Sequence, residues 1–324
     1  MAGTMLISLD FELFWGLLEE RTLESYQENV LGGRAAIPRL LKLFERYDIH
    51  ATWATVGFMF AESYGELKNY FPVEKPTYEK PGLSPYEYFA GIGDSEDTAP
   101  CFYAPGLIRL VSETPGQEIG SHTFSHFYCR EPGQTVEQFA ADMAAAKKIA
   151  ADHGYDVTSV ILPRNQCEPE YTRVFRELGF TAYRDEEDDW IHDKIKWFPL
   201  LRLFRLLDVY LPLTGQGVHK PRKEDGVWNF TGSGMFKPIR PALKFLEGIK
   251  MHRIKARMRC AAKNDLVFHL WWHPHNIGVM TNAHLQQLEE ILAYYQELKQ
   301  TYGMESLNMR EAALRLEQEH GSNG

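Results

Sequence analysis

Two short motifs carry side chains suited to metal-assisted hydrolysis. Asp10 and Glu12 are two positions apart after the apolar run 5–9, so on an extended chain both carboxylates point to the same side. His122 and His126 follow another apolar run and are four positions apart, a spacing at which two imidazoles can converge. Two imidazoles and one carboxylate are a common catalytic metal set with an open coordination position. We therefore predict that Glu12, His122 and His126 bind one divalent ion, and that Asp10 takes a proton from water.

A third cluster of potential catalytic side chains lies near the C-terminus. His269, His273 and His275 follow residues 265–268, of which 266–268 are apolar, and are separated by even steps, so an extended chain would place the three rings on one face. Such a row is unusual in an ordinary core strand, because each buried ring nitrogen needs a partner. A His-x-x-x-His pair alone is weak among 12 histidines, and this third cluster strengthens the metal-site interpretation.

Strands and helices alternate along the chain, which favours a parallel β/α arrangement. In a β/α barrel the site lies at the carboxyl ends of the strands, and Asp10, His122, Arg164 and His273 all fall at such ends. We expect strands at 5–9, 49–57, 117–121, 156–162, 180–183, within 218–236 and at 265–272, and helices at 34–47, 135–152, 168–178, 241–263, 282–302 and 307–319.

Taken together, these segments resemble the polysaccharide deacetylase superfamily, the carbohydrate esterases with a NodB-like domain. The resemblance covers roughly residues 4–310 and implies a distorted (β/α)7 barrel with a long insertion after the second strand. The first motif is Asp-x-Glu, where the commonest family form has two adjacent Asp, which indicates an atypical subgroup. The matching motifs are Asp10/Glu12, His122/His126, residues 163–166, residues 188–190 and His273.

The resemblance also implies roles for individual residues. Asp10 would act as general base and His273 as general acid, with His269 and His275 as other candidates for the acid. Arg164 would orient Asp10, and Asp189 would hold Arg164. A backbone N–H near Asn165 or Gln166 would stabilise the oxyanion. The expected metal is Zn²⁺, although Co, Ni, Mn or Fe would also suit the ligands. The substrate-binding candidates are Trp15, Asn165, Gln166, Trp190, Trp272 and His275.

The function that this interpretation favours is removal of an N-acyl group, most simply acetyl, from an amino sugar or saccharide precursor. A metal-dependent C–N hydrolase acting on a small amide or ureide is an alternative on the same frame. A deacetylase-like protein that binds saccharide without turnover is another, and the presence of Asp10 beside the metal set argues against it.

Two irregular stretches interrupt a predicted single domain of residues 1–319. Residues 61–116, rich in Pro and Tyr, are expected to form a flap, since long insertions are more often functional than idle. Residues 185–236 contain a basic amphipathic stretch at 194–211, which would either contact a membrane surface or pack internally or in a homo-oligomer interface. The tail 320–324 is expected to be disordered.

Composition limits the remaining possibilities. The 324 residues include 44 acidic and 35 basic side chains, a net charge of −9, which argues against broad nucleic-acid binding. No signal-peptide pattern and no apolar run of about 20 residues is visible, and four scattered Cys are typical of reduced thiols. These features predict a cytoplasmic protein whose partner is a saccharide or sugar nucleotide.

Overall fold

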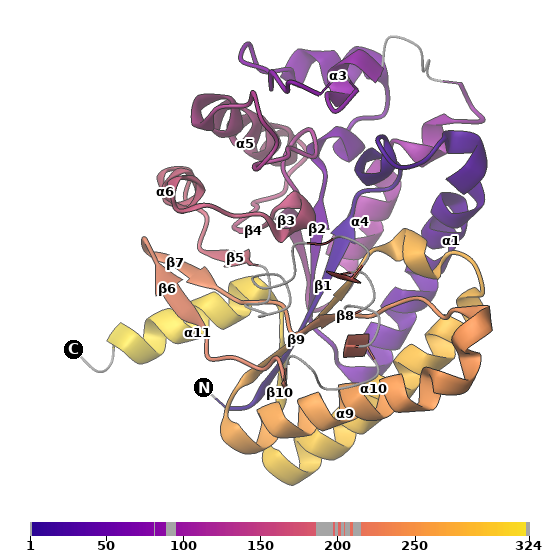
Figure 1. The fold of residues 1–324 in the computed structure, drawn as a ribbon. Coiled ribbons are helices and arrows are strands. Elements are labelled where there is room, and N and C mark those ends of the chain that lie inside the picture. The colour runs from indigo at the N-terminus through magenta and orange to yellow at the C-terminus, as the bar shows by residue number, and fades with distance from the viewer. Residues whose placement is uncertain are drawn as a thin grey trace.

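One curled, largely parallel sheet forms the centre of the molecule, with helices around it (Figure 1). The computed structural model describes residues 2–80, 82–88, 95–185 and 215–321, together with 197, 200–201, 204 and 208–209. The strand order is β6-β7-β5-β4-β3-β2-β1-β9-β8, and β10 pairs with the start of β1. The strands are β1 Thr4–Phe11, β2 Ala51–Thr55, β3 Gln117–Ser121, β4 Ser159–Ile161, β5 Ala182–Arg184, β6 Arg222–Glu224, β7 Val227–Asn229, β8 Gly234–Met235, β9 Val267–Trp272 and β10 Glu305–Leu307.

Helices follow most strands and return the chain to the opposite edge of the sheet, as a parallel arrangement requires. The α-helices are α1 Leu23–Tyr47, α2 Tyr64–Leu67, α3 Pro85–Tyr88, α4 Pro105–Glu113, α5 Val136–Asp152, α6 Pro169–Glu177, α9 Glu247–Asn264, α10 Thr281–Tyr302 and α11 Met309–Gly321. Short 3-10 helices are η1 Trp15–Leu17, η2 Gly57–Phe60, η3 Lys68–Tyr70, η5 Ala99–Cys101, η6 Pro163–Asn165, η7 Pro241–Leu246 and η8 Pro274–Ile277. This arrangement confirms the predicted distorted β/α barrel. Within the described residues, no helix is both long and apolar enough to cross a bilayer.

Strand β1 is the organising element because it is buried along its whole length and pairs in parallel with both β2 and β9. Its register aligns Leu9 with Trp272 and Asp10 with Ala54. The chain segments that follow β1, β2 and β9 therefore leave the sheet at the same edge. Strand β3 continues the series beside β2, with Ser121 aligned to Thr55.

The first long helix begins earlier than expected. The prediction placed Gly32 and Gly33 before a helix at 34–47, but both glycines lie inside α1. Both glycines are needed because the backbone of residues 275–278 approaches the helix closely. A Cβ at Gly33 would lie 2.8 Å from the Cα of His275, and a Cβ at Gly32 would lie 2.2 Å from the carbonyl oxygen of Gly278. The glycines thus let α1 pack directly against η8, the segment that follows β9.

The expected single strand within 218–236 is also corrected. The structure forms a β6–β7 hairpin next to β5, and then β8 beside β9 on the other side of the sheet. The chain turns between the two at Phe230–Ser233, a stretch with one glycine and no regular pairing of its own. Within the described residues, β7 and β8 do not pair, so the sheet curls without closing.

Candidate active site

The three predicted ligands converge beside the carboxyl end of β1. Glu12 Oε2 lies 3.2 Å from His122 Nε2 and 3.0 Å from His126 Nε2. One potential ligand atom from each residue lies within 4.8 Å of the others, and all three side chains are buried. Glu12 is more than a hundred positions from both histidines in the sequence, yet all three side chains lie close enough to bind one metal ion.

A backbone hydrogen bond fixes the orientation and the tautomer of the His122 ring. The backbone carbonyl of Ile161 can only accept a hydrogen bond, so Nδ1 of His122, at 2.8 Å, carries the proton and donates it. His122 Nε2 therefore has a free lone pair directed at Glu12, the usual state of a metal-binding imidazole. The residues present fit a metal ion on this ground.

The loop that carries His126 is held from behind by a buried acid. Asp142, on α5, accepts hydrogen bonds from the backbone N–H of Phe124 at 2.7 Å and from the N–H and hydroxyl of Ser125. Its helix begins with Thr135 as N-cap, completed by Gln138 as a capping box. The loop needs this support, because His126 itself has a left-handed backbone with φ of 58°.

Asp142 gives the protein a specific pH dependence of stability. Burial raises the pKa of Asp142 from 3.8 to about 6, although its hydrogen bonds oppose the rise. Because the pKa of Asp142 is raised in the folded state, its protonation adds to the free energy of unfolding. This contribution is fully present below pH 4 and is lost as pH rises through about 6. We expect Asp142→Asn to remove this dependence, so that between pH 4 and 7 the difference in unfolding free energy between variant and wild type changes by up to about 3 kcal/mol. Urea unfolding of both proteins across this range tests it, and parallel curves would contradict it.

The predicted base, Asp10, is gripped by an arginine that the sequence analysis did not identify. Arg184, at the end of β5, is fully buried, donates to Asp10 Oδ2 from NH2 at 2.7 Å, and lies 4.4 Å from the ring centre of Trp271. Its Nε donates to Asn165 Oδ1 at 2.8 Å. The other Asp10 oxygen, Oδ1, is buried and makes no hydrogen bond within the described residues. One oxygen is therefore anchored and the other is free to accept a proton.

A buried hydrogen-bond chain stands behind Arg184. The Phe230 carbonyl accepts from His269 Nδ1 at 2.8 Å, so His269 Nε2 must accept from the Ser8 hydroxyl, also at 2.8 Å. Ser8 in turn accepts from Arg184 NH1 at 2.7 Å. Burial lowers the pKa of His269 to about 3, consistent with this neutral form. His269 is thus part of the support for Asp10 and not a candidate acid.

His273 is placed where an acid is needed. Its Nε2 lies 3.7 Å from Asp10 Oδ2 and 3.6 Å from Glu12 Oε1, and its side chain is 22% exposed. The Asn276 side-chain amide donates to His273 Nδ1 at 3.1 Å. The proton of the neutral ring then sits on Nε2, which faces the carboxylates and the exposed side of the cluster.

The electrostatics keep both carboxylates ionised. Burial alone would raise the pKa of Asp10, but Arg184 together with His273 and His122 outweighs burial and lowers it. Burial likewise opposes ionisation of Glu12, but His273 and His126 beside it hold the pKa of Glu12 well below its ordinary value. Burial in turn lowers the pKa of His126, which favours the neutral, metal-binding imidazole.

Several predicted contacts are different in the structure. Arg164 does not contact Asp10: it pairs with Glu131 at 2.7 Å and with Glu19, and its guanidinium lies 4.4 Å from the ring centre of Tyr128. The turn η6 aims it away from β1, because Arg164 has a left-handed backbone with φ of 59°. Arg184, and not Arg164, is the arginine that binds Asp10.

The predicted oxyanion donors are also otherwise engaged. The N–H of Asn165 donates to the Leu162 carbonyl at 2.9 Å, and the N–H of Gln166 donates to the Pro163 carbonyl at 3.3 Å. Both bonds close the η6 turn, so neither N–H is available to a substrate in this structure. Asn165 instead orients Arg184 through its side chain, and the side-chain oxygen of Gln166 is buried without a partner among the described residues.

Two aromatic candidates for substrate binding lie in the core. Trp272 is fully buried and packs edge-on against Phe44 and Phe236, so its side chain does not reach the site. Trp15 is also buried, with its indole N–H donating to the Phe102 carbonyl at 2.8 Å. Trp15 nevertheless lines a shallow surface depression next to the site, whose lining also includes Leu83, Ser125, His126 and Tyr128.

His275, another predicted substrate contact, lies behind the proposed acid. It is buried and stacks on His273 with ring centres 5.1 Å apart and an interplanar angle of 29°. Burial lowers the pKa of His275 to about 3. It therefore supports the ring of His273. Asp189 and Trp190 lie outside the described residues.

Two further site features, Arg184 and Gly16, were missed by sequence reasoning. For Arg184 a signal existed: it follows the expected strand 180–183 directly, in the same way that Asp10 follows the expected strand 5–9. For Gly16 no signal existed, because its importance depends on a distant side chain. A Cβ at Gly16 would lie 2.2 Å from the Glu12 carboxyl carbon and Oε1.

We expect Gly16→Ala to displace the Glu12 carboxylate and to weaken metal affinity by roughly 10–100-fold, as substitutions behind metal ligands do. Competition titration with a chromogenic chelator measures this affinity. Gly106→Ala is the control, because a Cβ there meets no atom within 4 Å. Equal affinity of the two variants would contradict the role of Gly16.

Comparison with known proteins agrees with this fold. The family model for polysaccharide deacetylase matches residues 29–183, which include His122 and His126, and lie between Glu12 and Arg184. A comparison with curated proteins found no match. Among solved structures, one described as a polysaccharide deacetylase from Mycobacterium smegmatis has 12% identity and a TM-score of 0.63, covering 99% of this chain and 92% of that one. Another from Pseudomonas aeruginosa PAO1, and Puue allantoinase, each have 15% identity and a TM-score of 0.57, covering 97% of this chain and 90% of theirs.

The structure is a curled β/α barrel with two imidazoles and a carboxylate facing a second carboxylate at the carboxyl edge of the sheet. Over residues 29–183 the chain matches the polysaccharide deacetylase family model, and its fold is similar to that of solved structures described as polysaccharide deacetylases. At these identities the solved structures bear on the fold alone.

Proposed function

We propose that this protein is a metal-dependent hydrolase that removes an N-acyl group, most simply acetyl, from an amino sugar or saccharide precursor. The observation that carries the proposal is a combination of groups at one edge of the sheet. A three-residue donor set, a carboxylate oxygen without a partner among the described residues and an imidazole N–H lie within a few ångströms of each other.

Glu12, His122 and His126 would hold the ion, and Zn²⁺ is the expected metal because nitrogen-rich sets with one carboxylate suit it. When bound, the ion would polarise the acyl oxygen and make water more acidic. The remaining coordination positions would be open to water and substrate, as in other catalytic sites of this composition.

The chain's own residues would move the protons. Asp10 would accept the water proton at Oδ1, while Arg184 holds Oδ2 and keeps the carboxylate ionised. His273 would donate its Nε2 proton to the leaving amine, with Asn276 fixing that tautomer from the other side of the ring. The two groups serve opposite proton transfers and lie next to each other, so one bound amide would reach both.

A second candidate is hydrolysis of a small ureide, which the similarity to an allantoinase structure makes worth testing. The same metal ligands and proton-transfer residues would serve either substrate. Selectivity between an N-acyl sugar and a ureide would therefore depend on the side chains around the metal site.

Product analysis with the zinc-loaded protein separates these candidates. We expect acetate release from N-acetylglucosamine oligomers or from a nucleotide-linked N-acetyl sugar, and no opening of allantoin or ammonia release from small amides. The reverse result would favour the ureide hydrolase. Full metal occupancy without turnover of any acylated sugar or amide would favour a binding protein.

A further inference from the structure

The segment from Lys237 to Lys263 differs in charge from the rest of this acidic protein. It contains nine Lys or Arg and one Glu, a net charge of +8 in a chain of net charge −9. It comprises η7 and α9, which lies on the outside of the molecule along α10 (Figure 1). This concentration of positive charge indicates attraction to an anionic partner.

Some of these cations are used internally, and the exposed ones are not. Lys250 pairs with Glu247, Lys255 with Glu290, and Arg253 with Asp208. In contrast, the exposed Arg240, Lys244, Arg259 and Lys263 form no ion pair with an acidic residue in the described part of the chain. Within the described residues, the charge of these four side chains is therefore not neutralised by acidic neighbours.

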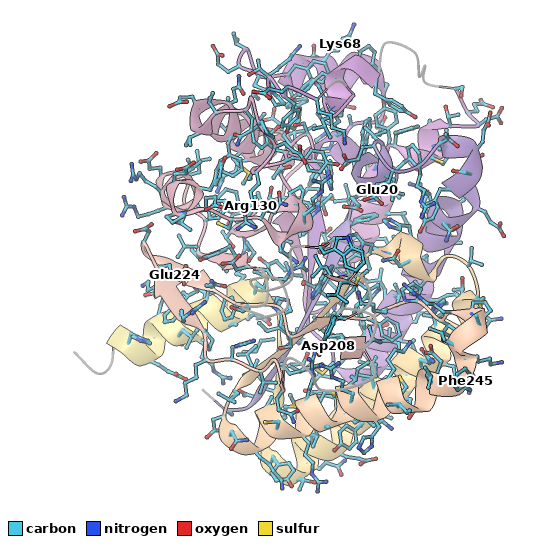
Figure 2. All side chains as sticks on the ribbon, in the orientation of Figure 1. Glu20, Lys68, Arg130, Asp208, Glu224 and Phe245 are labelled. Carbon is cyan, nitrogen blue, oxygen red and sulfur yellow. The ribbon has the colours of Figure 1, made fainter. Side chains whose placement is uncertain are left out.

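The same face carries exposed apolar side chains. Phe245 is 79% exposed and Ile249 is 46% exposed, one helical turn apart. With steps of four and three, the stripe continues through His252 and Ala256 to Arg259 and Lys263, none of which is buried. Figure 2 shows Phe245 at the outer end of this helix. The α9 face, defined as this stripe plus Arg240 and Lys244, is thus both apolar and basic.

The apolar end of the α9 face lies near the edge of the sheet that carries the site. Since α9 follows β8 and precedes β9 in a parallel sheet, the helix starts on the side of the strands' carboxyl ends. The backbone N–H of Ile239 donates to His284 Nε2 at 2.8 Å, so the start of α10 is adjacent. There, the partly exposed Val279 and Met280 follow His275 by a few residues.

We propose that the α9 face is a docking surface for an anionic lipid bilayer. An amphipathic surface with basic residues around exposed Phe and Ile is typical of helices that lie in the interface plane. A soluble polyanion would be attracted by the charge but would have no use for the apolar residues. The proposal concerns α9 and is independent of residues 194–211 and of the catalytic activity.

Co-sedimentation of the full-length protein with vesicles tests this inference. We expect binding to phosphatidylcholine vesicles that contain phosphatidylglycerol, weaker binding as salt is raised, and little binding to phosphatidylcholine alone. Each neutralised cation should weaken partitioning about fivefold, so Lys244→Gln with Arg259→Gln should weaken it roughly 25-fold. Phe245→Ser with Ile249→Ser should weaken it at least about tenfold.

The matched controls are substitutions of the same kind elsewhere. Lys68→Gln with Arg173→Gln removes two exposed cations, and Figure 2 shows Lys68 far from Phe245. Val73→Ser removes a side chain that is 96% exposed. Both controls should bind as wild type. Equal loss in controls and α9 variants, no vesicle binding, or binding to heparin but not to vesicles would overturn the proposal.

Discussion

Replacing Asp10 by Asn is expected to lower kcat by about 10²–10⁴-fold while the protein retains its metal. Asn is nearly isosteric but cannot accept the water proton as a carboxylate does. Because Asp10 is not among the three converging ligand atoms, metal content should stay near one ion per chain. Acetate release and elemental analysis of the same preparation measure both quantities.

This substitution also removes the charge partner of buried Arg184, so the fold must be checked separately. We expect a loss of about 3–5 kcal/mol in unfolding free energy, typical of breaking a buried ion pair on one side. Asp156→Asn is the control, because Asp156 is an exposed acid whose side chain pairs with Arg310 far from the site. A folded Asp10→Asn protein with wild-type kcat would refute the assignment of the base.

Replacing His122 by Ala is expected to abolish both metal retention and activity. It deletes a ligand whose tautomer is fixed by the Ile161 carbonyl. Only two metal ligands, Glu12 and His126, then remain. In the wild type, added Zn²⁺ should raise the melting temperature, since a ligand that binds only the folded state stabilises it. The variant should show no such shift.

His252→Ala is the matched control for this experiment, because His252 is an exposed histidine on α9. It should keep wild-type metal content, activity and Zn²⁺-dependent stabilisation. An active, metal-free His122→Ala protein would show that catalysis does not depend on this donor set.

The convergence of these side chains at one edge of the sheet was predicted from short-range signals. Asp10 and His122 end apolar runs, and parallel strands place such ends at one edge. The acid candidate His273 was identified in the same way. These residues need no knowledge of packing beyond strand order, which is why their convergence could be anticipated.

The parts that the sequence did not predict depend on distant packing. Whether Arg164, in the turn after β4, or Arg184, at the end of β5, reaches Asp10 depends on the backbone of η6, where Arg164 has a positive φ. Gly32 and Gly33 looked like a helix boundary, yet they are helical because η8 packs against them. The side chain of Trp272 points into the core, and this direction depends on the register of β9 beside β1.

Anomalous X-ray diffraction from crystals of the zinc-loaded protein, recorded on both sides of the zinc absorption edge, tests the central claim most directly. The account predicts one strong anomalous peak within bonding distance of Glu12, His122 Nε2 and His126 Nε2, with Asp10 Oδ1 close by but outside the coordination shell. A peak elsewhere, or a coordination shell without the two imidazoles, would contradict it.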